Sequence, residues 1–241
     1  MLSPTRLLIA SLVLATACSS GTPKSAPEPT STLPTFTQPP TTAPPTTTPA
    51  PVVTTATPTK AARRIPAREG DVDGDGTADS IRSRGSLLSI ELSGSGKTIT
   101  APVHKDGPGD AGLLGTDDVD RDGFAEVFLE TGSGASTTFA TPYRFDGTVL
   151  RELQLDGGPA RLVIGGSVTH GDGFTCLPSG RLEVRSADSP DGAEFTVHVD
   201  DYKLVGAQLV LQKSSSSHAK QGDPAVESSY EVHCGSVGDG G

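Results

Sequence analysis

Two short acidic segments with one shared pattern constrain this chain most, because each must hold several carboxylates within a single tight loop. They read DVDGDGTAD, from Asp71 to Asp79, and DVDRDGFAE, from Asp118 to Glu126. Both follow D-x-D-x-D-G-x-x-[DE], and their offset is 118 − 71 = 47 residues. Four carboxylates this close repel one another and raise each other's pKa unless a cation lies among them. The pattern therefore predicts two cation-binding loops.

The donor type favours calcium, which accepts about six to eight oxygen ligands in flexible geometry. Positions 1, 3 and 5 of each loop supply side chains, and the glycine at position 6 allows the sharp turn. Position 7 supplies a backbone carbonyl, and the acid at position 9 closes the shell. The predicted ligands of the first ion are Asp71, Asp73, Asp75, Thr77 and Asp79. Those of the second are Asp118, Asp120, Asp122, Phe124 and Glu126. The alternative is a pair of acidic surface turns that hold no ion.

These loops differ from EF-hands, which need a bidentate acid at position 12 and a helix on each side. Arg82 and Leu129 stand at that position, and strand-like sequence follows both loops. The loops instead resemble the FG-GAP or VCBS-type repeats of integrin-like β-propeller blades, in which a short acidic loop between strands binds Ca²⁺. The resemblance covers residues 70–155 and implies calcium on the eight carboxylates named above. A closed propeller has about four to eight blades, and this chain shows the pattern only twice.

Hydrophobic alternation with a period of two indicates β-strands through the rest of the domain. It is clearest in residues 88–92, 181–185 and 195–200. Asp-Gly pairs typical of hairpin turns stand at 146–147, 156–157 and 191–192. We therefore expect an all-β domain over residues 66–241. It would comprise two blade-like repeats, about 70–155, and a C-terminal β portion, about 156–241.

The N-terminus has the layout of a signal peptide, predicted over residues 1–17. Arg6 precedes an apolar run, Leu7 to Val13, that is too short to span a bilayer. The next residues, LATAC, resemble the lipobox of bacterial lipoproteins, although Ala15 stands where leucine is commonest. The resemblance implies lipidation of Cys18 and attachment to the outer face of a bacterial membrane, at the cell surface. Two acyl chains suffice for stable anchoring. The alternative is an ordinary secreted protein with a chance cysteine.

The chain has three cysteines, an odd number for an exported protein. If Cys18 carries lipid, Cys176 and Cys234 remain as a pair. An oxidising compartment favours a disulfide between them. The alternative is two buried free thiols.

A Thr/Pro-rich segment separates the predicted lipid from the predicted domain. Of residues 21–60, fourteen are threonine and eleven are proline, and no apolar periodicity survives. Such a composition cannot bury enough surface to offset the entropy of ordering. Residues 18–65 are therefore predicted to form the lipidated N-terminus and a disordered, extended linker, with a reach on the order of 100 Å.

The composition and the motifs that are missing from the sequence disfavour several classes of function. The net charge of −10 disfavours nucleic acid as a partner, and an aromatic content of 4% disfavours a stacking platform. GSGKT at 94–98 lacks the first glycine of a phosphate loop, and no G-x-S-x-G or zinc-ligand spacing occurs. We expect no enzyme, but a cell-surface lipoprotein whose calcium-stabilised domain binds or scaffolds a surface protein or glycan. The alternatives are an extracytoplasmic hydrolase with structural calcium loops and a purely structural envelope protein.

Overall fold

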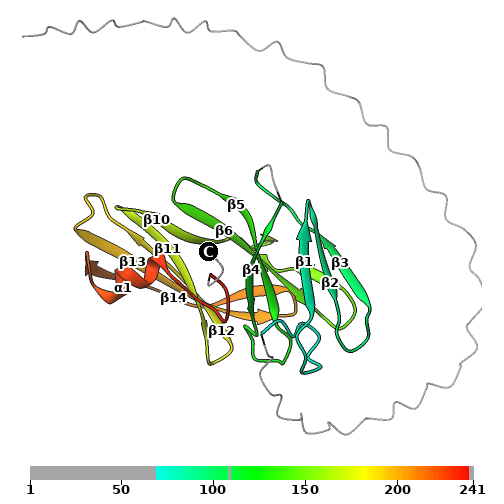
Figure 1. The fold of residues 1–241 in the computed structure, drawn as a ribbon. Coiled ribbons are helices and arrows are strands. Elements are labelled where there is room, and N and C mark those ends of the chain that lie inside the picture. Colours follow the sequence, from blue (N-terminus) through cyan, green and yellow to red (C-terminus); the bar gives the residue numbers. More distant parts are fainter. Residues whose placement is uncertain (1–68, 108–109, 239–241) are drawn as a thin grey trace, which may run out of the picture. The chain divides into compact units, whose positions relative to one another are not determined.

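The computed structural model describes residues 69–107 and 110–238 of the 241-residue chain. The predicted signal peptide, Cys18 and the linker lie outside the described residues. Within them the chain forms fifteen strands, one short α-helix and one 3-10 turn, which confirms the all-β class (Figure 1). The helical elements are α1 (Pro224–Glu227) and η1 (Ser228–Tyr230). Within the described residues, no helix has the length and apolar character needed to cross a membrane.

The first sheet is a three-stranded antiparallel meander with the order β1-β2-β3. Its strands are β1 (Ser80–Arg84), β2 (Leu87–Glu91) and β3 (Thr98–Pro102). Leu88 and Ile90 of β2 are fully buried, as the alternation predicts, and they share a core with Val127 and Tyr143 of the second sheet. Burial of apolar side chains from both sheets therefore holds the small sheet against the larger one.

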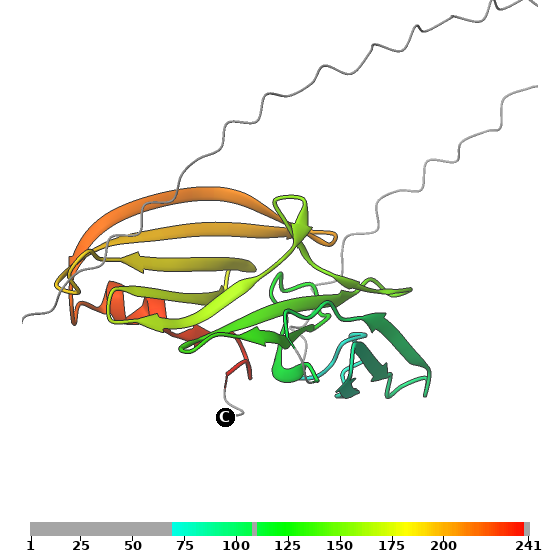
Figure 2. The ribbon, with the colours of Figure 1, turned by 90° about the horizontal axis from the view of Figure 1, so that it is seen from above.

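The second sheet has twelve strands in the order β4-β5-β6-β10-β11-β12-β13-β14-β8-β9, with β7 paired to β6 and β15 to β11. Its first strands are β4 (Gly112–Asp117), β5 (Glu126–Ser133), β6 (Thr137–Phe145), β7 (Leu150–Glu152), β8 (Gln154–Leu155) and β9 (Gly158–Pro159). The later strands are β10 (Leu162–Ser167), β11 (His170–Leu177), β12 (Arg181–Asp188), β13 (Glu194–Val205), β14 (Gln208–Lys220) and β15 (Val232–His233). In Figure 2, β13 and β14 form a long curved hairpin. Neither sheet of the described residues closes on itself.

Each acidic segment precedes a meander of three antiparallel strands. Loop 1 (residues 71–79) leads into β1-β2-β3, and loop 2 (residues 118–126) leads into β5-β6-β7. The base of loop 2 is the pair Asp117↔Glu126 between β4 and β5. At the corresponding place in loop 1, the Asp79 amide donates to the Gly70 carbonyl at 2.8 Å. The sequence repeat is therefore also a repeat of local structure.

The predicted Asp-Gly turns connect β6 to β7, β8 to β9 and β12 to β13. Each glycine has a positive φ, as these turns require. In the first turn, the backbone amides of Thr148 and Val149 donate to Asp146 Oδ1, both at 2.9 Å. The Val149 contact is the strongest of these, and together with the hydrogen bond that Arg151 Nε donates to Asp146 Oδ2 at 3.0 Å, they lower the pKa of Asp146 to about 2. The turn prediction is confirmed at all three places.

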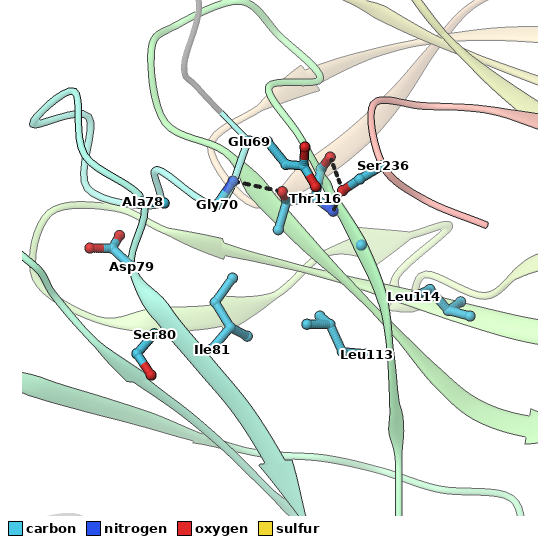
Figure 3. Close-up of a pocket in the computed structure, with 11 residues that line it drawn as sticks. Glu69, Gly70, Ala78, Asp79, Ser80, Ile81, Leu113, Leu114, Thr116 and Ser236 are labelled. Atoms are coloured by element: carbon cyan, nitrogen blue, oxygen red, sulfur yellow. Dashed lines mark hydrogen bonds between the residues drawn. The ribbon is translucent and has the colours of Figure 1, made fainter. Parts of the chain in front are cut away.

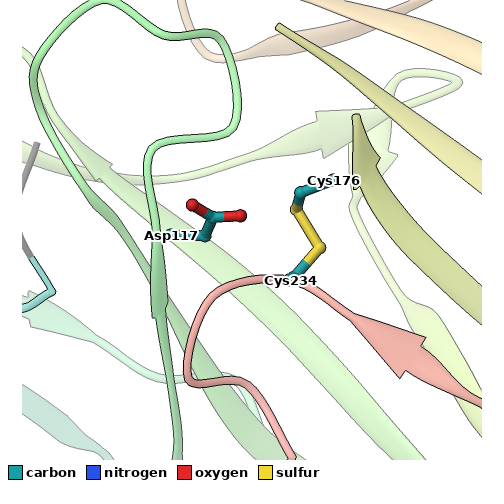
Figure 4. A group of neighbouring side chains, drawn as sticks. All are labelled: Asp117, Cys176 and Cys234. Atoms are coloured by element: carbon teal, nitrogen blue, oxygen red, sulfur yellow. A yellow bond between two sulfur atoms is a disulfide. The ribbon is translucent and has the colours of Figure 1, made fainter. Parts of the chain in front are cut away.

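A disulfide joins Cys176 of β11 to Cys234 of the C-terminal segment, with Cα atoms 4.7 Å apart, which confirms the predicted pairing (Figure 4). The bridge closes a loop with a sequence separation of 58 residues. Such a closure stabilises the folded state by about 4 kcal/mol in the chain-entropy account. Two residues beyond Cys234, the Ser236 amide donates to the Thr116 carbonyl at 3.2 Å. The disulfide thus fixes a segment that ties β11 to β4, the strand that enters loop 2.

His170, on β11, lies between two carboxylates. Its Nδ1 is 2.6 Å from Asp188 Oδ1 and its Nε2 is 2.6 Å from Asp172 Oδ2. The contact with Asp188, reinforced by Asp172 and opposed by partial burial, raises the pKa of His170 above its usual value. The protonated ring donates to both acids, so protonation strengthens the β11-β12 pairing.

We expect the substitution H170Q to destabilise the fold more at about pH 5.5 than at about pH 8.5. Because the pKa is raised on folding, this contribution is complete below the unfolded pKa of about 6.5 and is lost as pH rises through the folded pKa. Solvent screening of this half-exposed cluster keeps the effect below about 1 kcal/mol. Urea denaturation of both proteins at the two pH values measures it, and equal losses at both would contradict the assignment.

Candidate metal centres

Loop 1 brings three of its predicted ligands together. Oxygens of Asp71, Asp73 and Asp79 lie within 4.8 Å of one another. Asp71 is only 2% exposed, and the amides of Asp75 and Gly76 donate to its Oδ1 and Oδ2 at 3.0 and 2.9 Å. Backbone amides therefore hold the first carboxylate of the loop in place, at the position from which a calcium loop begins.

The remaining predicted ligands of loop 1 have other contacts. The carboxylate of Asp75 accepts from the Thr77 amide at 2.7 Å and from Ser93 Oγ at 3.0 Å. The Ser93 amide donates to Asp79 Oδ1 at 2.7 Å. Thr77 is exposed, and its described contact is made by its amide. The Thr77 carbonyl and the Asp75 side chain as ligands stay predictions.

The electrostatics of loop 1 are those of crowded like charges. Burial raises the pKa of Asp73, and the neighbouring carboxylates, chiefly Asp79, raise it further. Among residues 69–107 and 110–238, no lysine or arginine forms an ion pair with a carboxylate of this loop. The described part of the chain thus supplies hydrogen bonds to loop 1 but no side-chain counter-charge. This arrangement suits a bound cation.

Loop 2 repeats the backbone arrangement of loop 1. The amides of Asp122 and Gly123 donate to the two carboxylate oxygens of Asp118, each at 3.0 Å, as their counterparts do to Asp71. The Phe124 amide donates to Asp122 Oδ1 at 3.0 Å. The oxygens that lie within 4.8 Å of one another are those of Asp118, Asp120 and Asp122. As with Thr77, the predicted role of the Phe124 carbonyl stays a prediction.

Glu126, the last acid of loop 2, is fully buried. Its Oε2 accepts from the Val119 amide at 2.8 Å, just as Asp79 accepts from the Val72 amide in loop 1. Its Oε1 is buried without a hydrogen-bond partner. Burial raises the pKa of Glu126 well above its usual value, and the charge of Asp120 adds to that effect.

Arg144, on β6, also belongs to this site, although no sequence motif indicates it. Its Nη1 lies 2.6 Å from Asp120 Oδ2 and 3.5 Å from Glu126 Oε1, and its Nη2 donates to Asp122 Oδ2. The guanidinium therefore contacts three of the four carboxylates of loop 2. No local motif marks Arg144, because it stands 18 residues beyond the loop (144 − 126) and reaches it only through the β5-β6 pairing.

The two loops touch each other. The Ala125 amide of loop 2 donates to the Asp71 carbonyl at 2.9 Å. At Gly74, a Cβ atom would lie only 2.7 Å from the Gly123 carbonyl oxygen. Gly70, just before loop 1, donates to Thr116 Oγ1 at 2.8 Å. The loops therefore form part of the contact between the first and second sheets.

An open cleft of about 750 Å³ lies beside loop 1, between β1 and β4 (Figure 3). Ile81, Leu113 and Leu114 form its apolar lining, and Asp79 lies at its margin near Gly70. The cleft adjoins the candidate metal centre of loop 1, because Asp79 belongs to both. A ligand bound there would contact both sheets.

A third acidic group, Asp117 beside Cys176 and Cys234, is not a metal centre. The sulfur atoms of the two cysteines are joined in the disulfide (Figure 4) and so lack the thiolate charge that binds metals. Burial raises the pKa of Asp117, and the guanidinium of Arg121, 3.3 Å from its Oδ1, opposes that shift.

Comparison with known proteins gives no relative for this site. No protein-family model matches the chain, and neither a curated protein nor a solved structure is significantly similar to it. The resemblance to FG-GAP and VCBS-type repeats therefore stays an interpretation of the two loops.

The contact between the loops can be tested with two matched glycines of loop 1. Gly74 and Gly76 both have positive φ, but a Cβ at Gly76 would meet nothing within 4 Å. We expect G76A to cost about 1–2 kcal/mol through backbone strain alone. G74A should cost clearly more, because its methyl group would also collide with the carbonyl of loop 2. Chemical denaturation of both variants measures the difference, and equal losses would contradict a tight contact.

Proposed function

We propose that this protein is an exported bacterial lipoprotein whose β domain binds Ca²⁺ through its acidic loops. The domain serves as a binding or scaffold module at the cell surface. The observation that carries the calcium assignment is the convergence of Asp71, Asp73 and Asp79 in loop 1, with no lysine or arginine paired to them in the described residues. Loop 2 repeats this backbone geometry, which favours a recurring cation-binding loop over a chance cluster of acidic residues.

Calcium fits the donor set better than other common cations. The converging atoms are all carboxylate oxygens, which are hard ligands, and calcium tolerates their irregular arrangement more readily than magnesium does. Extracellular calcium modules bind with dissociation constants of about 10⁻⁴–10⁻³ M, so millimolar external calcium would occupy such a site.

The proposed role of the ion is to join the two sheets. Loop 1 leads directly into β1, and its backbone contacts loop 2 through the Ala125–Asp71 hydrogen bond. An ion that draws the carboxylates of loop 1 together would stiffen this contact and the first sheet with it. Because the ion binds the folded chain, it would raise stability by mass action.

The cell-surface location rests on the sequence. The apolar leader, the lipobox-like LATAC before the linker and the Thr/Pro-rich composition favour an anchored domain held away from its membrane. The Cys176–Cys234 disulfide is consistent with an oxidising compartment. We propose a surface protein or glycan as the partner, without a catalytic role.

Chelation tests the calcium assignment. We expect the melting temperature of the full-length chain to fall in EDTA and to recover in excess Ca²⁺ more than in excess Mg²⁺. At calcium a hundredfold above the dissociation constant, the gain is about 2.7 kcal/mol, or about 5–10 °C for a domain of this size.

The variant D73N should lose the part of the calcium-induced shift that comes from loop 1. D156N is the matched control, because it changes an aspartate in a distant hairpin turn where asparagine also tolerates positive φ. D156N should keep the shift. A melting temperature that is the same in EDTA and in calcium would refute the assignment.

A further inference from the structure

The two acidic loops have the same sequence pattern but receive different partners from the strands behind them. In each repeat the partner comes from the end of the second strand of the meander. For loop 1 it is Ser93, two residues after β2, which donates its amide and hydroxyl to Asp79 and Asp75. For loop 2 it is Arg144, the penultimate residue of β6. One loop therefore receives neutral donors and the other receives a cation.

The Arg144 guanidinium packs closely against the carboxylates of loop 2. The side chain of Arg144 is 13% exposed and stands 2.6 Å from Asp120 Oδ2. It also contacts Asp122, and its Nη1 is 3.5 Å from the fully buried Glu126. A planar guanidinium that contacts several carboxylates keeps its charge at all physiological pH values and loses little freedom in doing so. Loop 2 thus has an internal counter-charge that loop 1 lacks among the described residues.

A calcium ion entering loop 2 would meet this positive charge at close range. The contacts of Arg144 fall on positions 3, 5 and 9 of the loop, which are three of the positions predicted to ligate the ion. Repulsion between two cations that share carboxylates a few ångströms apart in a partly buried site weakens binding by more than about tenfold.

We propose that Arg144 is the resident cation of loop 2, so that the domain takes up one exchangeable Ca²⁺, at loop 1. This inference rests on the calcium binding proposed above and changes its stoichiometry from the two ions that the sequence predicts. It also assigns the loops different tasks. Loop 2 is closed at any calcium concentration, whereas loop 1 responds to calcium.

Equilibrium dialysis of the chelator-stripped, full-length chain against radioactive Ca²⁺ counts the ions directly. We expect one ion per wild-type chain and none for D73N over the same concentration range. In R144Q, the carboxylate oxygens that contact the guanidinium in the wild-type chain become available to bind an ion. Asp120 Oδ1, which is buried without a hydrogen-bond partner, is available as well. We therefore expect R144Q to bind two ions. R151Q is the matched control, because Arg151 pairs with Asp146 in an exposed hairpin, and it should bind one.

The outcomes separate this inference from the proposed function. Two ions in the wild-type chain, or one ion that survives in D73N, would overturn the assignment of Arg144 and leave calcium binding intact. No ion in the wild-type chain would refute the proposed function itself. If gel filtration or circular dichroism shows that R144Q does not fold, the wild-type and D73N counts decide the question alone.

Discussion

Backbone amides that donate to the first aspartate of each acidic loop are the interaction on which this structure depends. Asp71 and Asp118 each accept two such bonds from amides four and five residues further on, which bends the loop around its own carboxylates. The bend brings like charges together, and a bound cation would relieve their repulsion. The fold therefore places two acidic clusters, each of which could hold a cation, where its two sheets meet.

The surroundings of the loops explain why this requirement matters for the whole domain. Loop 1 leads into the small sheet, loop 2 joins two strands of the large sheet, and the loops contact each other through the Ala125–Asp71 bond. The C-terminal segment, held by the disulfide, reaches the same region through Ser236 and Thr116. A cation at this junction would thus act on both sheets at once. In the proposed function, calcium bound there would act as a structural clip between the two sheets.

The local features of the fold could be predicted from the sequence, whereas the partners of the site could not. Period-two alternation placed Leu88 and Ile90 in the core, and Asp-Gly pairs placed the hairpin turns, because both depend on neighbouring residues. Cysteine counting identified the disulfide. Arg144, Ser93 and the Ser236–Thr116 contact escaped notice, because each depends on strand pairing over long sequence distances. The shared sequence pattern of the two loops predicts equivalent sites. The folded structure shows that they differ, because Arg144 brings a positive charge to loop 2.

The most direct test of the account is a crystal structure of the full-length chain grown with calcium chloride, with an anomalous difference map recorded at long wavelength. We expect a calcium peak among Asp71, Asp73 and Asp79, and the Arg144 guanidinium still in contact with Asp120 and Asp122. A map without a peak at loop 1, from crystals in which the carboxylates of that loop are well ordered, would contradict it.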